Sequence, residues 1–481
     1  MERSGSSPQG ESRSIGLFGL AMINIVAIAS LRDLPQMASY GIGSIFFYLL
    51  AAVVFFFPVS LVAAELATAW PERGGVYVWV REAFGERWGF VAVFLQWSQN
   101  LCWYPVVLTF GAASLAFAVA PDQAAALSES KTFIVIVVLL AYWFSVLLNF
   151  RGLSGSAWVS IVGAFSGVVI PGTLLVGLAG LGLLQGEPSN LMKNGSELIP
   201  NLGNFSNITF AVSVWLAFAG MEMTAAHARE VRSPERTYPL GILIAAGVIL
   251  TVFILGALSI ATALAPDQYH LQSGVTEALQ SMFDRYGLGS LARVVAFGMA
   301  LGVFGSVNAW VIGPSKGLLA AAEKGALPPF LSRVNRNGVP TRILLVQGAA
   351  VSLICIAFTA QPTVASAYFM ISVLTIQMYL CMYIIMFAAA WRLRSLHPEQ
   401  KGKFQVPGGK PGLALACGLG GLGCLLSIGL GFFPPNQLKE SGIDPDSFKT
   451  FLAVGLLAAL GLPFLIAWAR SRGKSKPSSA S

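Results

Sequence analysis

Long apolar segments follow one another along nearly the whole chain, and short polar segments separate them. Each apolar segment has about 20 residues, the length that an α-helix needs to cross roughly 30 Å of bilayer hydrocarbon. Their approximate ranges are 14–40, 42–68, 88–119, 131–150, 153–184, 207–231, 237–264, 290–321, 341–360, 366–393, 411–433 and 449–469. The pattern therefore predicts an all-α membrane protein with about 12 transmembrane helices.

Polar residues interrupt two of these segments, at 30–35 in the first and at 217–222 in the sixth. Each interrupted segment opens one of two halves of five segments. Interrupted helices at corresponding positions of two halves indicate the substrate site of a transporter, near the middle of the membrane. We therefore expect a first repeat at 14–185 and a second repeat at 205–393, with two further helices at 411–470.

The first interruption places two oppositely charged residues, Arg32 and Asp33, shortly before Pro35. Pro35 cannot donate a backbone hydrogen bond, so nearby backbone groups lose their helical partners and must line a cavity or be buried in protein. Freed backbone and the hydroxyl of Ser30 can bind the amino and carboxyl groups of a substrate, and Arg32 can bind a second carboxylate. Alternatively, Arg32 pairs with Asp33 or Glu222 and only gates the site or stabilises the fold. The candidate substrate-binding residues here are Ala27, Ile28, Ser30, Arg32 and Asp33.

The second interruption combines a glycine with a carboxylate. Gly220 permits a break in the helix, and a half-helix that begins there points its positive end at the cavity. The Glu222 carboxylate can bind a substrate ammonium group, or take up a proton and link transport to pH. Alternatively, it only caps the half-helix. The candidate substrate-binding residues here are Ala217, Phe218, Ala219, Gly220 and Glu222.

Uncharged polar residues of other segments are candidates for the remaining walls of the site, although each can equally bond neighbouring helices. They are Gln96, Asn100, Ser306, Asn308 and Tyr379. Three residues are candidates for gating or pH sensing. Glu65, at the end of the second segment, suits a gate at the cytoplasmic face or a packing contact. Glu222 and His227 can titrate, but an ordinary interfacial histidine is the commoner case.

Charge is scarce and unevenly distributed. Charged residues make up 11% of the chain, against about 25% in soluble domains. Most Lys and Arg residues fall in alternate loops, which predicts a multi-pass protein with the tails 1–13 and 471–481 both in the cytoplasm. The net charge of +8 therefore reflects orientation and does not indicate a nucleic-acid partner. A short amphipathic cytoplasmic helix is predicted at 76–84.

No pattern in the sequence indicates an enzyme, a cofactor or a metal site. The three histidines are scattered, and the glycine-containing stretch 152–156 lacks the spacing and the lysine of a phosphate-binding loop. The five cysteines lie in apolar segments and are expected to be inert buried thiols. A non-transporting membrane receptor is a possible alternative class, but such a protein usually carries a soluble output domain, and none is visible.

Several short motifs resemble those of one membrane-protein superfamily, over about residues 14 to 470. The stretches 58–68 and 74–80 resemble the amino acid–polyamine–organocation (APC) superfamily. The stretch 218–222 is similar to its sixth-helix pattern, which continues at Glu230 and 233–234. More narrowly, the chain resembles the bacterial glutamate/γ-aminobutyrate antiporter group at 87–90, 313–315, 337–340 and 406–410.

This resemblance implies a LeuT-like fold, with a 5+5 inverted repeat and two extra C-terminal helices. It also implies alternating access, amino-acid exchange without a nucleotide, and a role at the site for Glu222. The chain departs from the group in three ways. It stops too soon for the long C-terminal plug, it has 305–307 as Gly-Ser-Val where members carry a glutamate, and it has Arg32-Asp33 where members carry Tyr-Glu.

The sequence thus predicts an amino-acid antiporter of the bacterial cytoplasmic (inner) membrane, with glutamate/γ-aminobutyrate-like exchange. A proton-coupled amino-acid symporter is the alternative. The expected partners are the lipid bilayer and a small-molecule substrate, an amino acid or its decarboxylated amine, and the protein is expected to be a monomer or a homodimer. Arg32 favours an acidic substrate if it is unpaired, and a neutral one if Asp33 or Glu222 neutralises it.

Overall fold

The structure is a computed structural model. It describes residues 15–72, 74–151, 162–163, 165–203, 208–209, 211, 214–223, 231–268, 270–435 and 443–474. These residues form helices and loops, and their β-structure is limited to one isolated bridge between Ile15 and Val231.

The described part of the first half of the chain contains long helices and short helical turns. They are α1 (Leu17–Ile28), α2 (Leu34–Ala38), η1 (Gly41–Gly43), α3 (Ser44–Ala51), η2 (Ala52–Phe56), α4 (Phe57–Ala69), α5 (Val76–Phe84), α6 (Glu86–Val119), η3 (Pro121–Gln123), α7 (Ala124–Glu129), α8 (Lys131–Phe150), η5 (Phe165–Val169), α10 (Ile170–Leu184) and α11 (Leu191–Asn194). From η1 to α4 the helix is continuous and forms one long apolar segment.

The second half contains four of the five described helices that have 30 residues or more. Its elements are α13 (Val214–Ala217), α14 (Pro234–Ala263), η7 (Pro266–Gln268), α15 (Gly274–Arg285), α16 (Gly289–Glu323), η8 (Pro329–Ser332), α17 (Thr341–Thr359), α18 (Val364–Leu396), α19 (Gly409–Leu430) and α21 (Pro445–Lys474).

Ten helical segments of the described chain are long and apolar enough to cross a membrane. The two expected crossings outside this set are the first and the sixth, the two that the sequence predicts to be interrupted. The first is divided into α1 with 12 residues and α2 with 5 residues, each too short to cross alone. Only part of the sixth lies within the described residues. The predicted all-α membrane fold is confirmed.

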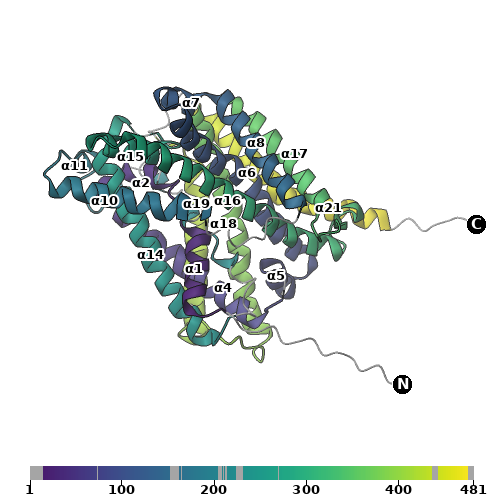
Figure 1. Ribbon diagram of the computed structural model, residues 1–481. Helices are drawn as coiled ribbons and strands as arrows, with labels where there is room; N and C mark the ends of the chain where they lie inside the picture. The colour runs from purple at the N-terminus through teal and green to yellow at the C-terminus, as the bar shows by residue number, and fades with distance from the viewer. Residues whose placement is uncertain are drawn as a thin grey trace, which may run out of the picture.

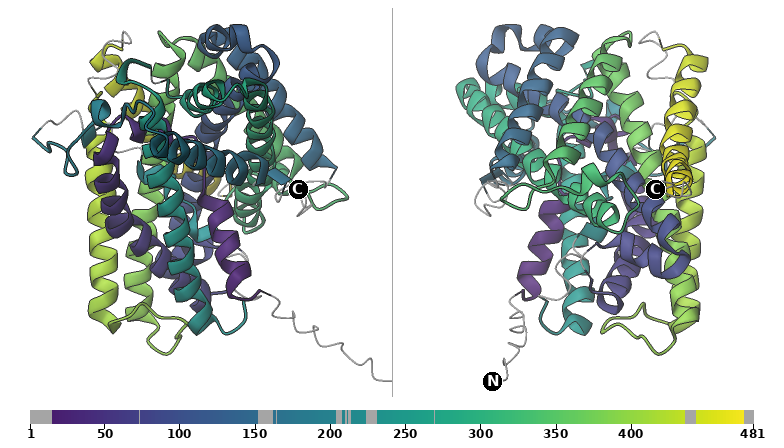
Figure 2. Two further views of the ribbon diagram at one scale, coloured as in Figure 1. Left: turned by 60° about the vertical axis from the view of Figure 1, so that its left-hand side comes forward. Right: turned by 90° about the vertical axis from the view of Figure 1, so that its right-hand side faces the viewer.

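Helices α6 and α18 lie at the centre of the bundle (Figure 1). In their most apolar stretches 78% and 83% of the residues are buried, against 22% for Pro445–Arg470 at the C-terminal end. Figure 2 accordingly shows the yellow helix α21 along the outside of the bundle. Because α6 and α18 are shielded from lipid, their polar side chains can face other helices and a site between them.

Glycines let α16 approach its neighbours closely. A Cβ atom added at Gly302 would lie 2.3 Å from Cα of Gly167 in η5. On the side of α6, a Cβ atom added at Gly111 would lie 2.8 Å from Cγ1 of Val303. Close approach of backbones through small residues is the usual way in which helices associate in lipid.

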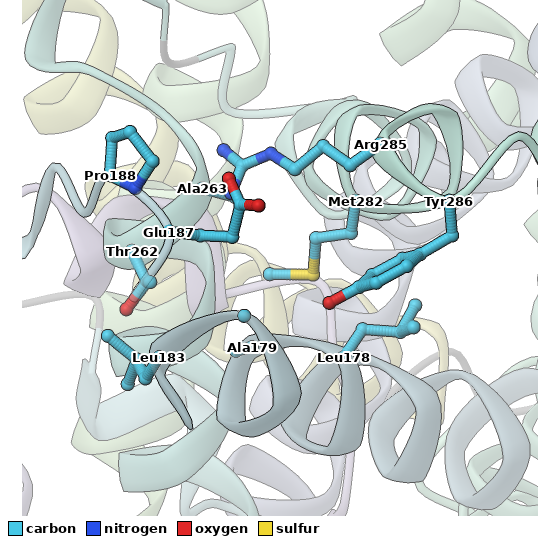
Figure 3. A pocket seen from close by; sticks show the side chains of 11 residues that line it. Leu178, Ala179, Leu183, Glu187, Pro188, Thr262, Ala263, Met282, Arg285 and Tyr286 are labelled. Carbon is cyan, nitrogen blue, oxygen red and sulfur yellow. The ribbon is translucent and has the colours of Figure 1, made fainter. Parts of the chain in front are cut away.

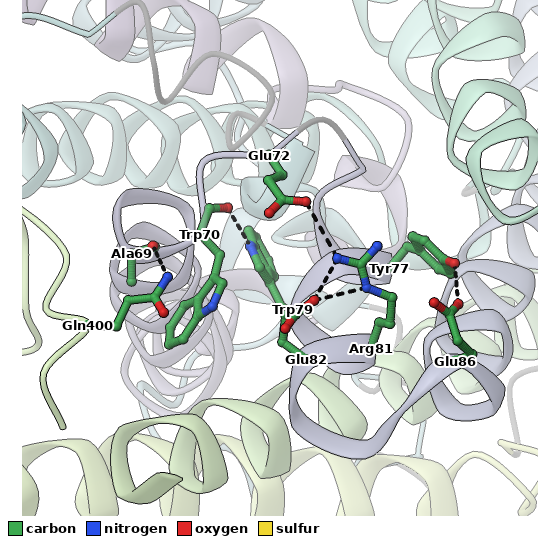
Figure 4. Close-up of polar contacts among 9 residues, drawn as sticks. All are labelled: Ala69, Trp70, Glu72, Tyr77, Trp79, Arg81, Glu82, Glu86 and Gln400. Carbon is green, nitrogen blue, oxygen red and sulfur yellow. Dashed lines mark hydrogen bonds and ion pairs between the residues drawn. The ribbon is translucent and has the colours of Figure 1, made fainter. Parts of the chain in front are cut away.

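One end of the bundle is formed by α5 and by the connection 397–408 between α18 and α19. The indole Nε1 of Trp79 donates to the carbonyl of Trp70 at 3.4 Å, and the Gln400 amide donates to the carbonyl of Ala69 at 3.3 Å (Figure 4). The predicted helix at 76–84 is confirmed with the same bounds. Both elements pack around the C-terminal end of α4.

At the other end, α15 packs on the second half of the interrupted first helix (Figure 1). A Cβ atom added at Gly274 would lie 2.8 Å from Cβ of Pro35. Just before α15, Nδ1 of His270 lies 2.9 Å from Oε1 of Glu277, and its Nε2 lies 4.0 Å from Oε1 of Glu129 in α7. The hydrogen-bonding contact with the Glu277 carboxylate raises the pKa of His270 above its usual value.

Candidate functional site

The interruption of the first helix is a short non-helical segment, 29–33. Helix α1 ends at Ile28, and Ala29 has an extended backbone. The backbone N–H of Arg32 donates to the hydroxyl of Ser30 at 3.3 Å, and α2 then begins with Pro35 in its first turn. Because proline has no N–H, it suits this position, where a helical hydrogen bond would be missing in any case.

Within this segment Arg32 pairs with its own neighbour, Asp33. The guanidinium Nε donates to Oδ1 at 3.0 Å, and a terminal nitrogen donates to Oδ2 at 2.8 Å. Both residues are buried, with 3% and 7% of their surface exposed. The sequence left the partner of Arg32 open. In the structure that partner is Asp33, and the two charges cancel in a bidentate pair.

The interruption of the sixth helix centres on Gly220. Helix α13 ends at Ala217, and Gly220 has φ +120°, a conformation that side chains other than that of glycine rarely adopt. Its backbone N–H, which has no helical partner, donates to the hydroxyl of Tyr383 in α18 at 2.9 Å. Phe218 between them packs against Tyr48 and other aromatic rings.

Glu222 follows this break and is buried, with 2% of its surface exposed. Its carboxylate accepts hydrogen bonds from the hydroxyls of Tyr379 and Tyr383. The amide Nε2 of Gln96 in α6 donates to Oε1 at 3.0 Å. Within the described part of the chain, these donors are all neutral, and no Lys or Arg forms an ion pair with Glu222. The site therefore contains a buried carboxylate whose charge its described neighbours do not balance.

Tyr383 is a residue of this cluster that the sequence analysis missed. It joins the two parts of the break, because its hydroxyl accepts from Gly220 and donates to Glu222. The available signal was its spacing from Tyr379, since residues four positions apart lie on the same face of a helix. Stacking of the two rings, with centroids 4.8 Å apart, reflects that spacing.

Among the candidate wall residues, Asn100 lies next to the cluster. Its amide nitrogen donates to the carbonyl of Gln96 at 2.8 Å, and its buried Oδ1 has no partner in the described structure. Asn308 instead accepts from Asn149 of α8 at 2.9 Å and so connects two helices. For Asn308 the structure therefore agrees with the alternative prediction, a hydrogen bond between neighbouring helices.

The remaining candidates lie at different depths. Ser306 is exposed, on the face of α16 that carries Gly313 two turns later. A Cβ atom added at Gly313 would lie 3.4 Å from Cε of Met223, the residue after Glu222. Ser306 thus faces the same side as the cluster but is not part of its hydrogen-bond network. Ile28, Ala217 and Ala219 are buried beside the two breaks, and Ala27 belongs to the last turn of α1.

Of the gating candidates, Glu65 lies at the end of the bundle formed by α5 and the connection 397–408. Its carboxylate pairs with Arg394 of α18, whose Nε donates to Oε1 at 2.8 Å. It also accepts from the backbone N–H of Val406 at 2.7 Å. Glu65 therefore fastens α4 to α18 and to the connection. His227 lies outside the described residues.

A small hollow between α10, α14 and α15 is separate from the cluster (Figure 3). Thr262, Glu187, Arg285 and Tyr286 supply its polar side chains, and Met282 and Leu178 supply apolar ones. None of the residues that surround Glu222 lines it. The candidate site is therefore the network at the two interrupted helices.

Comparison with known proteins identifies the family. The family model described as "Amino acid permease" matches residues 15–457. An uncharacterized transporter of Legionella pneumophila, lpg1691, is 38% identical, covering 94% of this chain and 96% of its own. A glutamate/gamma-aminobutyrate antiporter of Lactococcus lactis is 29% identical, covering 94% and 90%.

A probable agmatine/putrescine antiporter of Lactococcus lactis, AguD, is 25% identical over 81% of each chain. Two of these relatives are thus named as antiporters, of amino acids or of amines, and one as an uncharacterized transporter. Two helix breaks, a buried carboxylate between central helices, and a family match over most of the chain agree with one another. The chain belongs to the amino acid permease family of the APC superfamily, and it is a multi-pass membrane transporter rather than an enzyme.

Proposed function

We propose that this transporter is an amino-acid antiporter that works by alternating access. It exchanges an external amino acid for a decarboxylated or related internal one. The observation that carries the proposal is the buried Glu222 carboxylate, which lies beside the break at Gly220 and is bonded by Gln96, Tyr379 and Tyr383. Support also comes from the glutamate/gamma-aminobutyrate and agmatine/putrescine antiporters among the relatives.

In this proposal the two breaks bind opposite groups of the substrate. The Arg32–Asp33 pair is neutral as a whole, whereas Glu222 contributes one uncompensated negative charge. A substrate ammonium group, or a proton, balances that charge, and a buried charge needs such a partner because its desolvation costs several kcal/mol. Backbone groups at Ser30, and the Gly220 N–H once it leaves the Tyr383 hydroxyl, bind the amino-acid backbone of the substrate.

We place the two repeats at 14–185 and 205–393, because each then opens with an interrupted helix. The end of the bundle with α5 and the connection 397–408 is the cytoplasmic end, and both termini lie in the cytoplasm. Positively charged loops at this end support that orientation, since Lys and Arg accumulate in cytoplasmic loops. The membrane is the bacterial cytoplasmic membrane, as the bacterial relatives suggest.

Counterflow in proteoliposomes tests the proposal. Vesicles that contain the purified protein are loaded with one unlabelled amino acid or amine, and uptake of a labelled amino acid is measured. An antiporter takes up label only when an exchangeable substrate is inside, because each half-cycle needs a bound substrate. Equal uptake into empty vesicles under an inward proton gradient would replace the antiporter by a proton-coupled symporter.

We also propose that Glu65 is part of a gate at the cytoplasmic end. The Glu65 carboxylate is buried and Arg394 is half-buried, so removing the charge of Glu65 removes charge-assisted hydrogen bonds that are only partly screened by water. Glu65→Gln is therefore expected to loosen the connection 397–408 from α4 and to favour opening of this end. Spin labels at positions 72 and 401, both exposed, should report a longer distance in Glu65→Gln.

The exposed carboxylate of Glu82 supplies the matched control for this experiment. Glu82→Gln removes a charge from the neighbouring helix α5 without touching the contact between Glu65 and Arg394. Its distance distribution should equal that of the parent protein. If Glu65→Gln gives the same distribution as well, the ion pair does not hold this end closed and the gate assignment fails.

A further inference from the structure

The Arg32–Asp33 pair occupies one of the two edges through which a guanidinium can bind a carboxylate. A guanidinium binds a carboxylate through two parallel N–H groups, and here Nε and one terminal nitrogen are both committed to Asp33, at 3.0 and 2.8 Å. A substrate carboxylate that came to Arg32 would have to displace Asp33 from this edge or bind the other edge, which the two terminal nitrogens form. The charge that would attract such a substrate is already cancelled within the protein.

The surroundings of the pair are polar and incompletely bonded. Tyr368 of α18 lies close enough to interact electrostatically with Arg32 and Asp33, and Tyr48 of α3 interacts in the same way with Asp33. The hydroxyls of both tyrosines are buried and have no hydrogen-bond partner in the described structure. Buried hydroxyls without partners are unfavourable, so these two are suited to bind a polar group that enters beside the pair.

The same side of α18 connects this region to Glu222. Tyr368 and Tyr379 are eleven positions apart, which is about three turns of an α-helix and brings both onto one face. Ser372 and Thr375 lie between them on that face, and all four are buried. Tyr48 in turn packs against Phe218 of the sixth-helix break, with ring centroids 6.2 Å apart. The charged pair and Glu222 thus lie along one polar stripe of a central helix.

We propose that Asp33 is a specificity-determining residue, which neutralises Arg32 and makes the site prefer a neutral side chain over an acidic one. The inference rests on the proposed function, because it assigns the substrate class of that same site. In the wild-type protein the substrate is therefore an amino acid or amine without a second carboxylate. Asp33, rather than the presence of an arginine, decides whether glutamate is accepted.

The test compares two isosteric ligands, glutamine and glutamate, as trapped substrates in the counterflow assay. Wild-type protein is expected to prefer glutamine. Asp33→Asn frees the Arg32 fork and should shift the preference at least tenfold toward glutamate, since charge-assisted hydrogen bonds contribute more than neutral ones. In Asp33→Asn combined with Arg32→Gln the shift should disappear, because the variant has no guanidinium to release.

A second variant keeps the inference testable if Asp33→Asn fails to fold. Arg32→Gln leaves the Asp33 carboxylate unpaired, so the preference should shift at least tenfold toward lysine over norleucine, which has the same carbon chain without the ammonium group. Glu82→Gln is the matched control, because it also removes the carboxylate that pairs with a neighbouring arginine, Arg81, but on α5 outside the candidate site. It should leave both preferences unchanged.

The failures of the two proposals are distinguishable in this design. If wild-type protein prefers glutamate, or if a folded Asp33→Asn variant exchanges substrate with the wild-type preference, Asp33 does not set specificity although exchange itself stands. If no amino acid or amine supports counterflow in the wild-type protein, the proposed exchange function fails. Thermal unfolding in detergent shows whether each variant is folded. If Asp33→Asn is not folded, the preference of Arg32→Gln for lysine over norleucine decides whether Asp33 sets specificity.

Discussion

Replacing Glu222 by glutamine is expected to reduce saturable uptake by about 100-fold or more while the protein stays folded. The amide has the same shape as the carboxylate and can still bond two of the three groups around it, Gln96, Tyr379 and Tyr383. It cannot balance a substrate ammonium group or bind a proton. Losing one partner of a buried hydrogen-bonded charge pair costs about 2–5 kcal/mol, and each 1.4 kcal/mol is tenfold in affinity.

Transport in proteoliposomes measures this effect, with the amount of inserted protein determined for each variant. Glu222→Ala should lose uptake as well, but it also leaves the three donors without an acceptor, so its folding must be checked separately. Glu86→Gln is a suitable control, since it removes a carboxylate bonded by a tyrosine, Tyr77, outside the candidate site. Full activity of Glu222→Gln would remove Glu222 from the binding site.

Replacing Gly302 by alanine is expected to destabilise the folded protein by about 3 kcal/mol or more. The added Cβ would lie 2.3 Å from Cα of Gly167 and 2.7 Å from the carbonyl oxygen of Gly163. Both atoms belong to the backbone, so no side chain can rotate away, and α16 must move from η5. The same helix carries Asn308 and Gly313, and its displacement would therefore also disturb the site.

The melting temperature of the detergent-purified protein and its elution by size exclusion report this change. Gly180→Ala is the matched control, because Gly180 is also a helical glycine but its added Cβ would meet no atom within 4 Å. That variant should be as stable as the parent or slightly more so, since alanine is a better helix former. Equal stability of the two variants would mean that α16 and η5 are not packed through Gly302.

Much of the fold could be predicted from the sequence because its causes are local. A segment of about 20 apolar residues specifies a crossing wherever it occurs. Pro35 and Gly220 break helices through their own covalent structure, so both interruptions could be located before any contact was known. Glu222 was identified for the same reason: a carboxylate next to a break inside an apolar segment is conspicuous in the sequence alone.

The sequence was less informative about which groups meet. Arg32 had three possible partners, Asp33, Glu222 and a substrate, and each was compatible with the pattern. Gln96 and Tyr383 reach Glu222 from α6 and α18, more than 100 positions away in the chain. Asn308, a candidate for the substrate site, bonds Asn149 instead, because the side of α16 that carries it packs on α8.

The sequence by itself thus determined that this protein is a helical membrane protein with two interrupted helices and a carboxylate beside one of them. Only the tertiary structure decided that Arg32 is neutralised by Asp33, that three neutral donors bond Glu222, and that Glu65 fastens α4 to Arg394. The physical reason is the range of the interactions. Helix formation and breaking depend on neighbouring residues, whereas hydrogen bonds in a bundle depend on how distant helices pack and on which faces they present.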